Sequence, residues 1–234
     1  YADSAITVTP AATSGTGVTL TASADTFVSG HNGTYLTIGG KQVKITGFTS
    51  ATQVTITILE TLASTSAEAD WAEQLISSVR GFPQAVSFHD NRLWFAGVRD
   101  KPSAVIGSHI GGYFNFDLGT GLADEGINVA IAGDKVNEVR HLVSSRNLQI
   151  FTDSGEFFVP VSSQSAAITP SNITFLRQTP YGCNRSSPIP FDGASLFSQK
   201  NGKAIREYVF SDVEQAYRST SVSVLASHLI DVPK

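Results

Sequence analysis

A repeated pattern of short apolar stretches and polar turns constrains this chain most strongly. Three units each contain an apolar strand, a polar turn and a second apolar strand; these units are residues 85–97, 139–152 and 187–198. Their turns, near Asp90, Arg146 and Gly193, recur at intervals of about 45–55 residues. Serial hairpins at such a period are typical of β-propeller blades, whose four-stranded sheets bury their faces only against neighbouring sheets. We therefore predict a partial β-propeller-like array over residues 81–234.

Two further turns extend this pattern. Asp153 to Gly155 reads as a tight turn, and Asn201-Gly202 is the strongest short hairpin signal in the chain. Three units are too few to close a propeller of four or more blades. Because the chain starts at Tyr1 and has no methionine, we expect it to be an excerpt of a longer protein. Missing segments or other subunits would then close the ring.

The N-terminal part has a different pattern. Residues 1–63 alternate β-branched and polar residues, with glycine-rich turns between them, which predicts a small β-sandwich or barrel module. Residues 64–80 read as a connector. Thr65 and Glu68 have the spacing of a capping box, so one or two helical turns are expected there. Trp71 is expected to anchor this connector onto a neighbouring domain.

The composition and charge of the chain argue for some kinds of binding partner and against others. Charged residues make up only 15% of the chain and hydrophobic residues 41%, which favours a sizeable core and contact with partner chains over disorder. The net charge of −4 and the scattered basic residues argue against a nucleic-acid-binding surface. No apolar stretch is long enough for a membrane anchor. The lone cysteine, Cys183, reads as a small apolar filler.

Catalytic motifs are weak throughout. The five histidines are dispersed without metal-ligand spacing, and neither a nucleophile elbow nor a phosphate-binding loop is present. The densest acidic segment contains Asp124, Glu125, Asp134 and Glu138. Such carboxylates could hydrolyse a glycoside or bind calcium, although solvated loop acids are the simpler interpretation. We therefore predict no catalytic, cofactor-binding or metal-binding residues, and not an enzyme.

One segment carries a family resemblance. The matching positions in residues 80–116 are Gly81, Pro83, Phe88, Arg92, Leu93, Phe95, Gly97, Lys101, Pro102, Ser108, Gly111, Tyr113 and Phe116. With these residues, the segment resembles the tail tubular protein B, or nozzle, family of short-tailed bacteriophages and related prophage tail proteins. Weaker matches extend the likeness over roughly residues 70–230.

The resemblance implies a structural virion protein. In that family a β-propeller-containing subunit forms a ring, usually a hexamer, below the portal and adaptor and near the tail fibres. The ring is a conduit through which DNA passes without sequence-specific binding. Such a protein would be made in the cytoplasm of the bacterial host, would reside in the phage tail, and would need no cofactor.

The residues themselves suggest plain structural roles. Gly81, Gly97 and Gly111 suit turns with unusual φ, and Pro83 suits a strand entry. Arg92 is expected to hold the turn beside Asp90 or to pair with an adjacent blade. The following residues are expected to lie in the core between blades: Phe88, Leu93, Phe95, Tyr113, Phe114 and Phe116. The candidates for assembly are Gly81, Pro83, Arg92, Trp94, Phe95, Gly97, Gly111, Tyr113 and Phe116.

Two alternatives remain open at this stage. A receptor- or carbohydrate-binding β-module at the tail tip could stack sugars on Trp94, Tyr113 or Tyr181. A propeller glycosidase would use Asp124 and Glu125.

Overall fold

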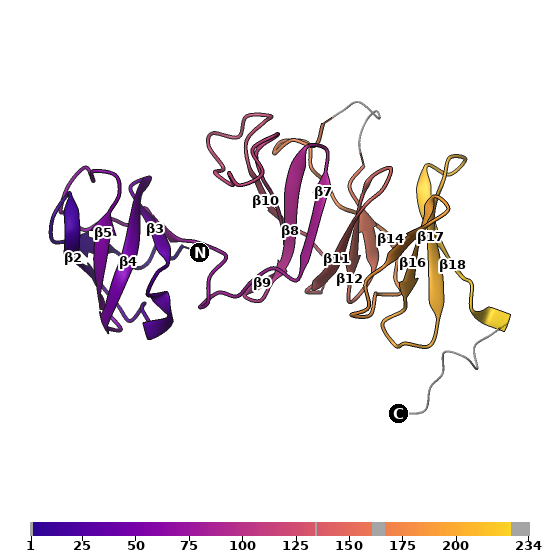
Figure 1. Ribbon diagram of the computed structural model, residues 1–234, viewed down its shortest axis with the longest axis horizontal. Coiled ribbons are helices and arrows are strands. Elements are labelled where there is room, and N and C mark those ends of the chain that lie inside the picture. The colour runs from indigo at the N-terminus through magenta and orange to yellow at the C-terminus, as the bar shows by residue number, and fades with distance from the viewer. Residues whose placement is uncertain (1, 134, 161–166, 226–234) are drawn as a thin grey trace. The chain divides into compact units, whose positions relative to one another are not determined.

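The computed structural model describes residues 2–133, 135–160 and 167–225. These residues form 18 β-strands and one short 3-10 helix, and they contain no α-helix. The prediction of a mainly-β protein is therefore confirmed. The chain divides into two compact units, Tyr1–Phe82 and Pro83–Lys234 (Figure 1).

The N-terminal unit is built on one antiparallel sheet. Its strands are β1 (Val8–Pro10), β2 (Gly15–Ala22), β3 (Tyr35–Ile38), β4 (Lys41–Ser50), β5 (Gln53–Ile58) and β6 (Trp71–Glu73), with the 3-10 helix at Ser29–His31. They pair in the order β1-β2-β5-β4-β3-β6 and curl into a half-barrel (Figure 1). Strand alternation places Leu20, Val43, Val54 and Ile56 in the core of this curl, fully or almost fully buried.

The prediction of one or two helical turns in residues 64–80 is wrong. Trp71–Glu73 is strand β6, which pairs with β3, and the backbone of Glu68 pairs with that of Val8. These cross-strand hydrogen bonds use the backbone groups that a capping box would need. Trp71 is buried in the core of its own unit, where its Nε1–H donates to the carbonyl oxygen of Ile6 at 2.8 Å. It is therefore part of this sheet rather than an anchor for another domain.

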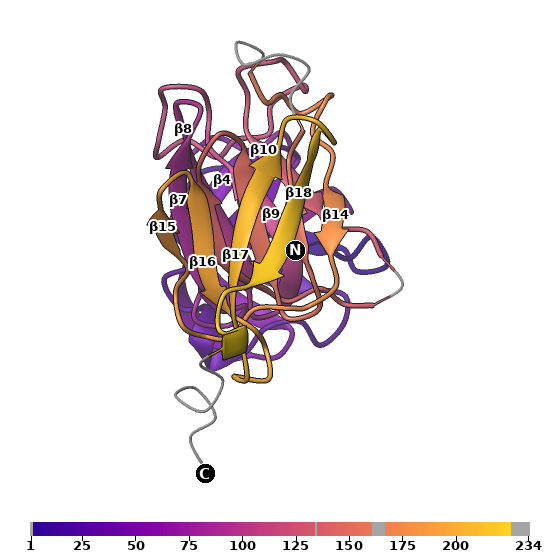
Figure 2. The same ribbon diagram turned by 90° about the vertical axis from the view of Figure 1, so that its right-hand side faces the viewer.

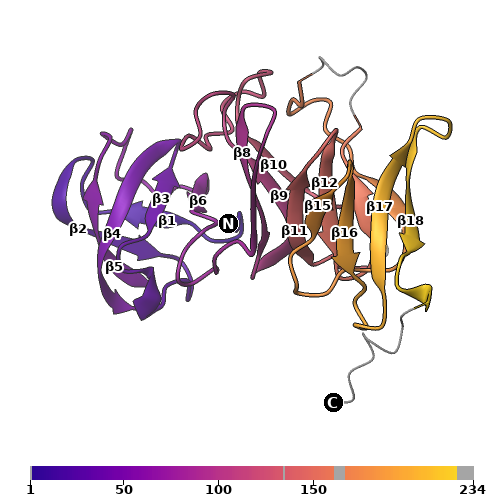
Figure 3. The same ribbon diagram turned by 45° about the vertical axis from the view of Figure 1, so that its right-hand side comes forward.

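The second unit contains three four-stranded antiparallel sheets. The first consists of β7 (Ala85–His89), β8 (Arg92–Val98), β9 (Lys101–Gly107) and β10 (Ile127–Ala130); the second of β11 (Val139–Ser144), β12 (Leu148–Thr152), β13 (Glu156–Phe158) and β14 (Leu176–Thr179); the third of β15 (Ile189–Phe191), β16 (Ala194–Ser198), β17 (Ile205–Ser211) and β18 (Ala216–Ser221). Each sheet pairs its strands in chain order, as a simple meander (Figure 3). This arrangement is consistent with propeller-like blades.

The three predicted hairpins are confirmed as the first two strands of each sheet. Asp90 and Asn91 take φ angles of 48° and 54° between β7 and β8, and Asp192 and Gly193 take 47° and 78° between β15 and β16. Positive φ at both central residues is the geometry that matches the twist of paired strands. Asn201-Gly202, in contrast, lies in a longer loop, because the last pair of β16 and β17 joins Ser198 to Ile205.

The three sheets stack face to face. One core lies between the first and second sheets and includes Trp94, Ala96, Ile150 and Phe157. The other lies between the second and third sheets and is largely aromatic; its members are Phe151, Phe158, Cys183, Phe197, Tyr208 and Tyr217. In Figure 2 the third sheet faces the viewer and the other sheets of this unit lie behind it. The second sheet is thus covered on both faces by its neighbours.

Cys183 lies in the second of these cores. Burial, together with the nearby Glu156, raises the pKa of its thiol to about 12. The thiol is therefore protonated at neutral pH and poorly nucleophilic, in agreement with the interpretation of Cys183 as a filler.

Candidate functional site

Arg92 organises the long loop between β9 and β10. It is completely buried, although it is a charged residue. Its guanidinium donates to the carbonyl oxygens of Ala123 and Glu125, each at 2.7 Å, and to that of Ser108. The predicted role at the Asp90 turn is wrong. Arg92 instead fastens the far end of the loop to β8, because three carbonyl acceptors are within reach of one planar guanidinium.

Trp94 and Gly97 also lie on β8, where the first sheet meets the second. Trp94 is fully buried, and its Nε1–H donates to the carbonyl oxygen of His89 at 3.0 Å. Gly97 has a φ of 70°, and a Cβ atom there would lie only 2.2 Å from the carbonyl oxygen of Val139. Glycine is therefore required for the close approach of these two sheets.

Other candidate residues gather on the outer face of the first sheet. Phe95 stacks on Phe116 with ring centroids 5.3 Å apart, and Phe88 meets Tyr113 edge-on at 5.2 Å. Gly111, with a φ of 71°, donates its N–H to the carbonyl oxygen of Asn91 at 2.8 Å and holds the loop beside the hairpin. The sequence therefore identified residues that the fold brings together, although it missed which face they occupy.

We call this surface the first end face and define it by Val86, Phe88, Phe95, Tyr113 and Phe116. Val86, Phe88 and Phe95 alternate along β7 and β8 with residues that face the second sheet, and Tyr113 and Phe116 come from the β9–β10 loop. Phe88 is 61% exposed and Val86 60% exposed. The prediction that Phe88 lies in a core between blades is thus wrong for the contacts within this chain.

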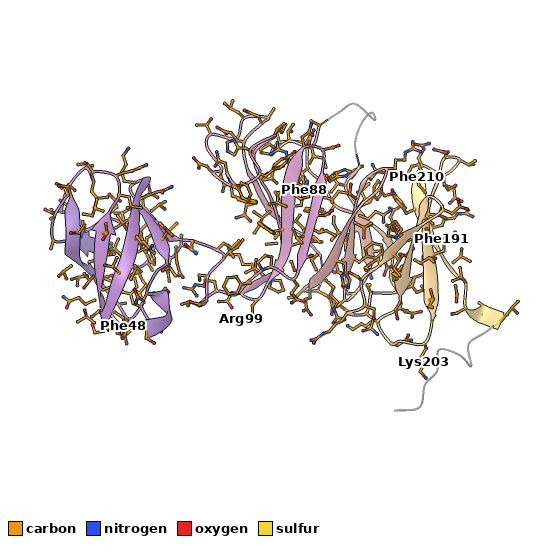
Figure 4. All side chains as sticks on the ribbon, in the orientation of Figure 1. Phe48, Phe88, Arg99, Phe191, Lys203 and Phe210 are labelled. Atoms are coloured by element: carbon orange, nitrogen blue, oxygen red, sulfur yellow. The ribbon has the colours of Figure 1, made fainter. Side chains whose placement is uncertain are left out.

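The third sheet has an equivalent surface on its outer side. We call it the last end face and define it by Ile189, Phe191, Leu196, Ile205 and Val209. Phe191 is 65% exposed and Ile189 64% exposed. Figure 4 labels Phe88 on the first sheet and Phe191 on the third. The stack therefore presents an apolar surface at each of its two ends.

Several predicted assembly residues do not belong to either face; besides the buried Arg92, Trp94 and Gly97, these include Gly81 and Pro83. Gly81 has a φ of 98° and pairs with Ser77 at the end of the N-terminal unit, and Pro83 begins the second unit. Phe114, which was expected in a core, is 94% exposed in the β9–β10 loop. No catalytic or cofactor-binding role was predicted for Gly81, Pro83 or Phe114.

Glu125, in the acidic segment, has a structural role in its own loop. The carboxylate of Glu125 accepts the backbone N–H groups of Thr120, Gly121 and Leu122 at 2.7, 2.5 and 2.7 Å, so it shapes its own loop. Asp124 is exposed, and Asp134 lies outside the described residues. Within residues 2–133, 135–160 and 167–225 no cluster of acidic, histidine or cysteine side chains could hold a metal ion.

The residues considered for sugar stacking have different environments. Trp94 is buried, so it cannot contact a ligand at the surface. Tyr181 is covered by the guanidinium of Arg206, whose central carbon lies 3.3 Å from the ring centroid. Tyr113 is 38% exposed, so a ligand could reach it directly.

Comparison with known proteins gives little further information. No family model and no curated protein matches the chain. Among solved structures, the chain is similar to an auxiliary nutrient binding protein from Bacteroides thetaiotaomicron VPI-5482, with a TM-score of 0.38 and 13% identity. The match covers 89% of this chain and 56% of that one, so this chain spans little more than half its length. A likeness at this level carries no argument about function. In the part of the chain that the structure describes, no helix is long and apolar enough to cross a membrane.

Proposed function

We propose that this chain is a structural protein of a bacteriophage tail whose second unit assembles into a ring with other copies of itself. The observation that carries the proposal is the pair of apolar end faces, with Phe88 and Phe191 each more than 60% exposed. Large exposed apolar patches on a folded protein mark interaction surfaces. A stack of blade-like sheets that covers its middle sheet and leaves both ends open is suited to extension by a neighbour.

The two end faces support a particular mode of assembly. They differ in sequence, so the first end face of one copy would pack against the last end face of the next. Such a head-to-tail contact forms a closed ring when the rotation between copies is correct, and an open filament when it is not. A ring is also what the resemblance to the nozzle family implies. The resemblance to that family further implies six copies in the ring and a position below the portal and adaptor.

The charge of the chain is compatible with a conduit for DNA. The net charge is −4. Transit of DNA requires few contacts with phosphates, because each Lys or Arg that binds a phosphate strengthens non-specific binding. A weakly acidic subunit would therefore let DNA slide past without holding it.

Sedimentation velocity and negative-stain electron microscopy test the proposal. We expect the wild-type chain to form rings, and we expect Phe88→Asp and Phe191→Asp to abolish them, because each variant buries a charge in an apolar contact. Phe48→Asp in the N-terminal unit, where Phe48 is 40% exposed, is the matched control and should still form rings. A wild-type chain that stays monomeric throughout the micromolar range would contradict the proposal.

A carbohydrate- or receptor-binding module at the tail tip is the second candidate. Its support is the exposed aromatic side chain of Phe114, which lies beside Tyr113 in the β9–β10 loop. Exposed aromatic rings provide flat apolar surfaces for stacking on sugars. A glycan array should show hits that Phe114→Ala and Tyr113→Ala remove, and an array without hits would dispose of this candidate.

A further inference from the structure

A concave pocket in the three-sheet unit has a basic lining. It has a volume of about 300 Å³ and is lined by Gln84, Arg140, His141 and Arg185. Binding sites for small molecules begin at about this size. The four side chains come from three different parts of the stack. Gln84 and Arg185 are 101 positions apart in the sequence (185 − 84 = 101).

These residues occupy related places in the three sheets. Gln84 directly precedes β7, Arg140 and His141 lie near the start of β11, and Arg185 lies in the segment that leads to β15. Strands β7, β11 and β15 are the first strands of their sheets. The pocket therefore forms where the chain enters the first strand of each successive sheet, and its composition depends on the stacking of all three.

Arg140 is held in place with part of its hydrogen-bonding capacity unused. Its side chain is only 15% exposed, and Nη1 donates to the carbonyl oxygen of Cys183 at 3.1 Å. Nη2 lies 3.7 Å from a carboxylate oxygen of Glu138, beyond ordinary hydrogen-bonding distance. Its Nε is buried and has no hydrogen-bond partner among the described residues. A ligand in the pocket could therefore use Nη2, but not the inaccessible Nε, as a donor of this side chain.

The other side chains add charge and acceptors. The side chain of Arg185 forms no ion pair within the described ranges, so its positive charge is not offset by a contact there. Glu138 is the acidic neighbour, and it also accepts the Gln84 Nε2–H at 3.0 Å. Two guanidinium groups thus line the pocket, and Glu138 is near that of Arg140. The local excess of positive charge favours an oxyanion, which planar guanidinium groups bind well.

His141 and Gln84 offer acceptors to the same space. His141 Nε2 lies 3.1 Å from the carbonyl oxygen of Asn184, so it carries the proton that this bond requires. Its pKa is lowered mainly by burial and further by Arg140, so the ring is neutral at pH 7 and Nδ1 is an acceptor. Gln84 donates through Nε2 and therefore keeps its carbonyl oxygen as an acceptor. Acceptors of this kind suit hydroxyl groups.

We infer that the pocket binds a small polyhydroxylated anion, that is, a sugar acid or a sugar phosphate. Arg140 and Arg185 hold the carboxylate or phosphate, and Gln84 and His141 accept from hydroxyl groups of the same molecule. This site is independent of ring formation, since its four residues lie within one copy of the chain.

Isothermal titration calorimetry tests this inference with two probes, D-glucuronate and glucose 6-phosphate, and with glucose and inorganic phosphate as partial ligands. We expect saturable binding of at least one probe with a Kd of about 1 mM or lower. Arg185→Gln should weaken that binding at least about tenfold, because one charge-assisted contact is lost. Arg185 is exposed, so this variant leaves the fold intact, whereas Arg140→Gln also removes the bond to Cys183. Lys41→Gln, which changes the charge equally at an exposed position of the N-terminal unit, is the control and should bind as the wild type does.

The outcomes distinguish a carboxylate ligand from a phosphate ligand. Binding of glucuronate alone assigns a carboxylate, and binding of glucose 6-phosphate alone assigns a phosphate. The inference is overturned if neither probe binds saturably, if Arg185→Gln binds as tightly as Lys41→Gln, or if glucose binds as well as the two anions. It is equally overturned if inorganic phosphate and the sugar phosphate bind with equal affinity, since the hydroxyl contacts would then contribute nothing.

Discussion

The N-terminal sheet and the three-sheet stack satisfy their apolar residues in different ways. In the N-terminal sheet, Val54 and Ile56 of β5 are fully buried, while Thr55 and Thr57 point to the other face. Strand β15 of the stack has Ile189, Pro190 and Phe191 in succession, and all three are exposed. Strict alternation is typical of a sheet with one solvated face, and continuous apolar residues of a sheet covered on both faces. The apolar residues of the first region thus lie in its own core, whereas β15 leaves apolar residues exposed at one end of the stack.

Two buried glutamates, Glu73 and Glu156, show that the two regions also differ in how they accommodate a buried carboxylate. Burial alone would raise the pKa of Glu73, but hydrogen bonds from His31 and Arg80 lower it below its ordinary value. Glu73 Oε2 lies 2.8 Å from Arg80 Nη2. Glu156, between the second and third sheets, has a raised pKa because burial outweighs its hydrogen bond from Thr179. The self-contained sheet pairs its buried charge with Arg80, whereas for Glu156 the charge of Arg206 is the smallest of the influences on its pKa.

The chain has two tryptophans, Trp71 and Trp94, one in each unit. Trp94→Phe leaves Trp71 to report on the N-terminal sheet, and Trp71→Phe leaves Trp94 to report on the stack. Urea unfolding followed by tryptophan fluorescence in these two backgrounds therefore measures the units separately.

The largest expected effect is that of Gly97→Ala on the stack. The new Cβ would lie 2.2 Å from the carbonyl oxygen of Val139, and φ is 70°. We expect the free energy of unfolding of the stack to fall by about 4 kcal/mol, from left-handed strain and overpacking together. Gly40→Ala in the N-terminal sheet, with a φ of 73° and open space around the new Cβ, should cost about 1 kcal/mol in the Trp71 background. Equal costs would show that the close approach of the sheets is unimportant.

Glu73→Gln should have the next largest effect. It leaves Arg80 and His31 without their buried carboxylate, so the N-terminal sheet should lose about 3 kcal/mol at neutral pH. A carboxyl with a lowered folded pKa contributes stability above its unfolded value of 4.5, and this contribution is lost as the pH falls through the folded pKa. The difference between wild type and variant should therefore shrink in acid. A difference that is independent of pH would contradict this interpretation.

Glu156→Gln is expected to raise the free energy of unfolding at neutral pH rather than to lower it. A carboxyl with a raised folded pKa contributes its full stability below the unfolded value of 4.5 and loses it as the pH rises through the folded pKa. At neutral pH the variant should therefore be more stable than wild type by roughly 1 kcal/mol, since no buried charge remains. The gain, read from Trp94, should vanish at low pH. A loss of stability at neutral pH would mean that the ionised carboxylate is needed.

The sequence predicted the hairpins well because their signals are local. The turn residues at Asp90 and Gly193, and the apolar strands around them, specify two paired strands without reference to the rest of the chain. It failed at β6, where the backbone partners of Trp71–Glu73 lie on β3, more than 30 positions away (71 − 38 = 33). Long-range pairing of this kind outweighs a local capping signal.

The candidate surfaces were predictable only in part. Apolar residues on both faces of a strand indicate two packing partners, but they do not say whether a partner lies within the chain. Phe88 was therefore assigned to a core that this chain does not complete. Arg92 was placed at a turn because its sequence neighbour is acidic, whereas its actual partners are carbonyl oxygens of a loop more than 15 positions away. The basic pocket was missed for the same reason, since Gln84, Arg140 and Arg185 meet only after the sheets stack.

Hydroxyl-radical footprinting of the assembled particle tests the central claim most directly, namely that the two end faces of the stack are covered by neighbouring copies. Labelling of Phe88, Phe191 and Phe48 would be measured by mass spectrometry in the assembly and in the dissociated chain. The account predicts that Phe88 and Phe191 are labelled in the free chain and protected in the assembly, while Phe48 is labelled equally in both. Equal labelling of Phe88 and Phe191 in the two states would contradict it.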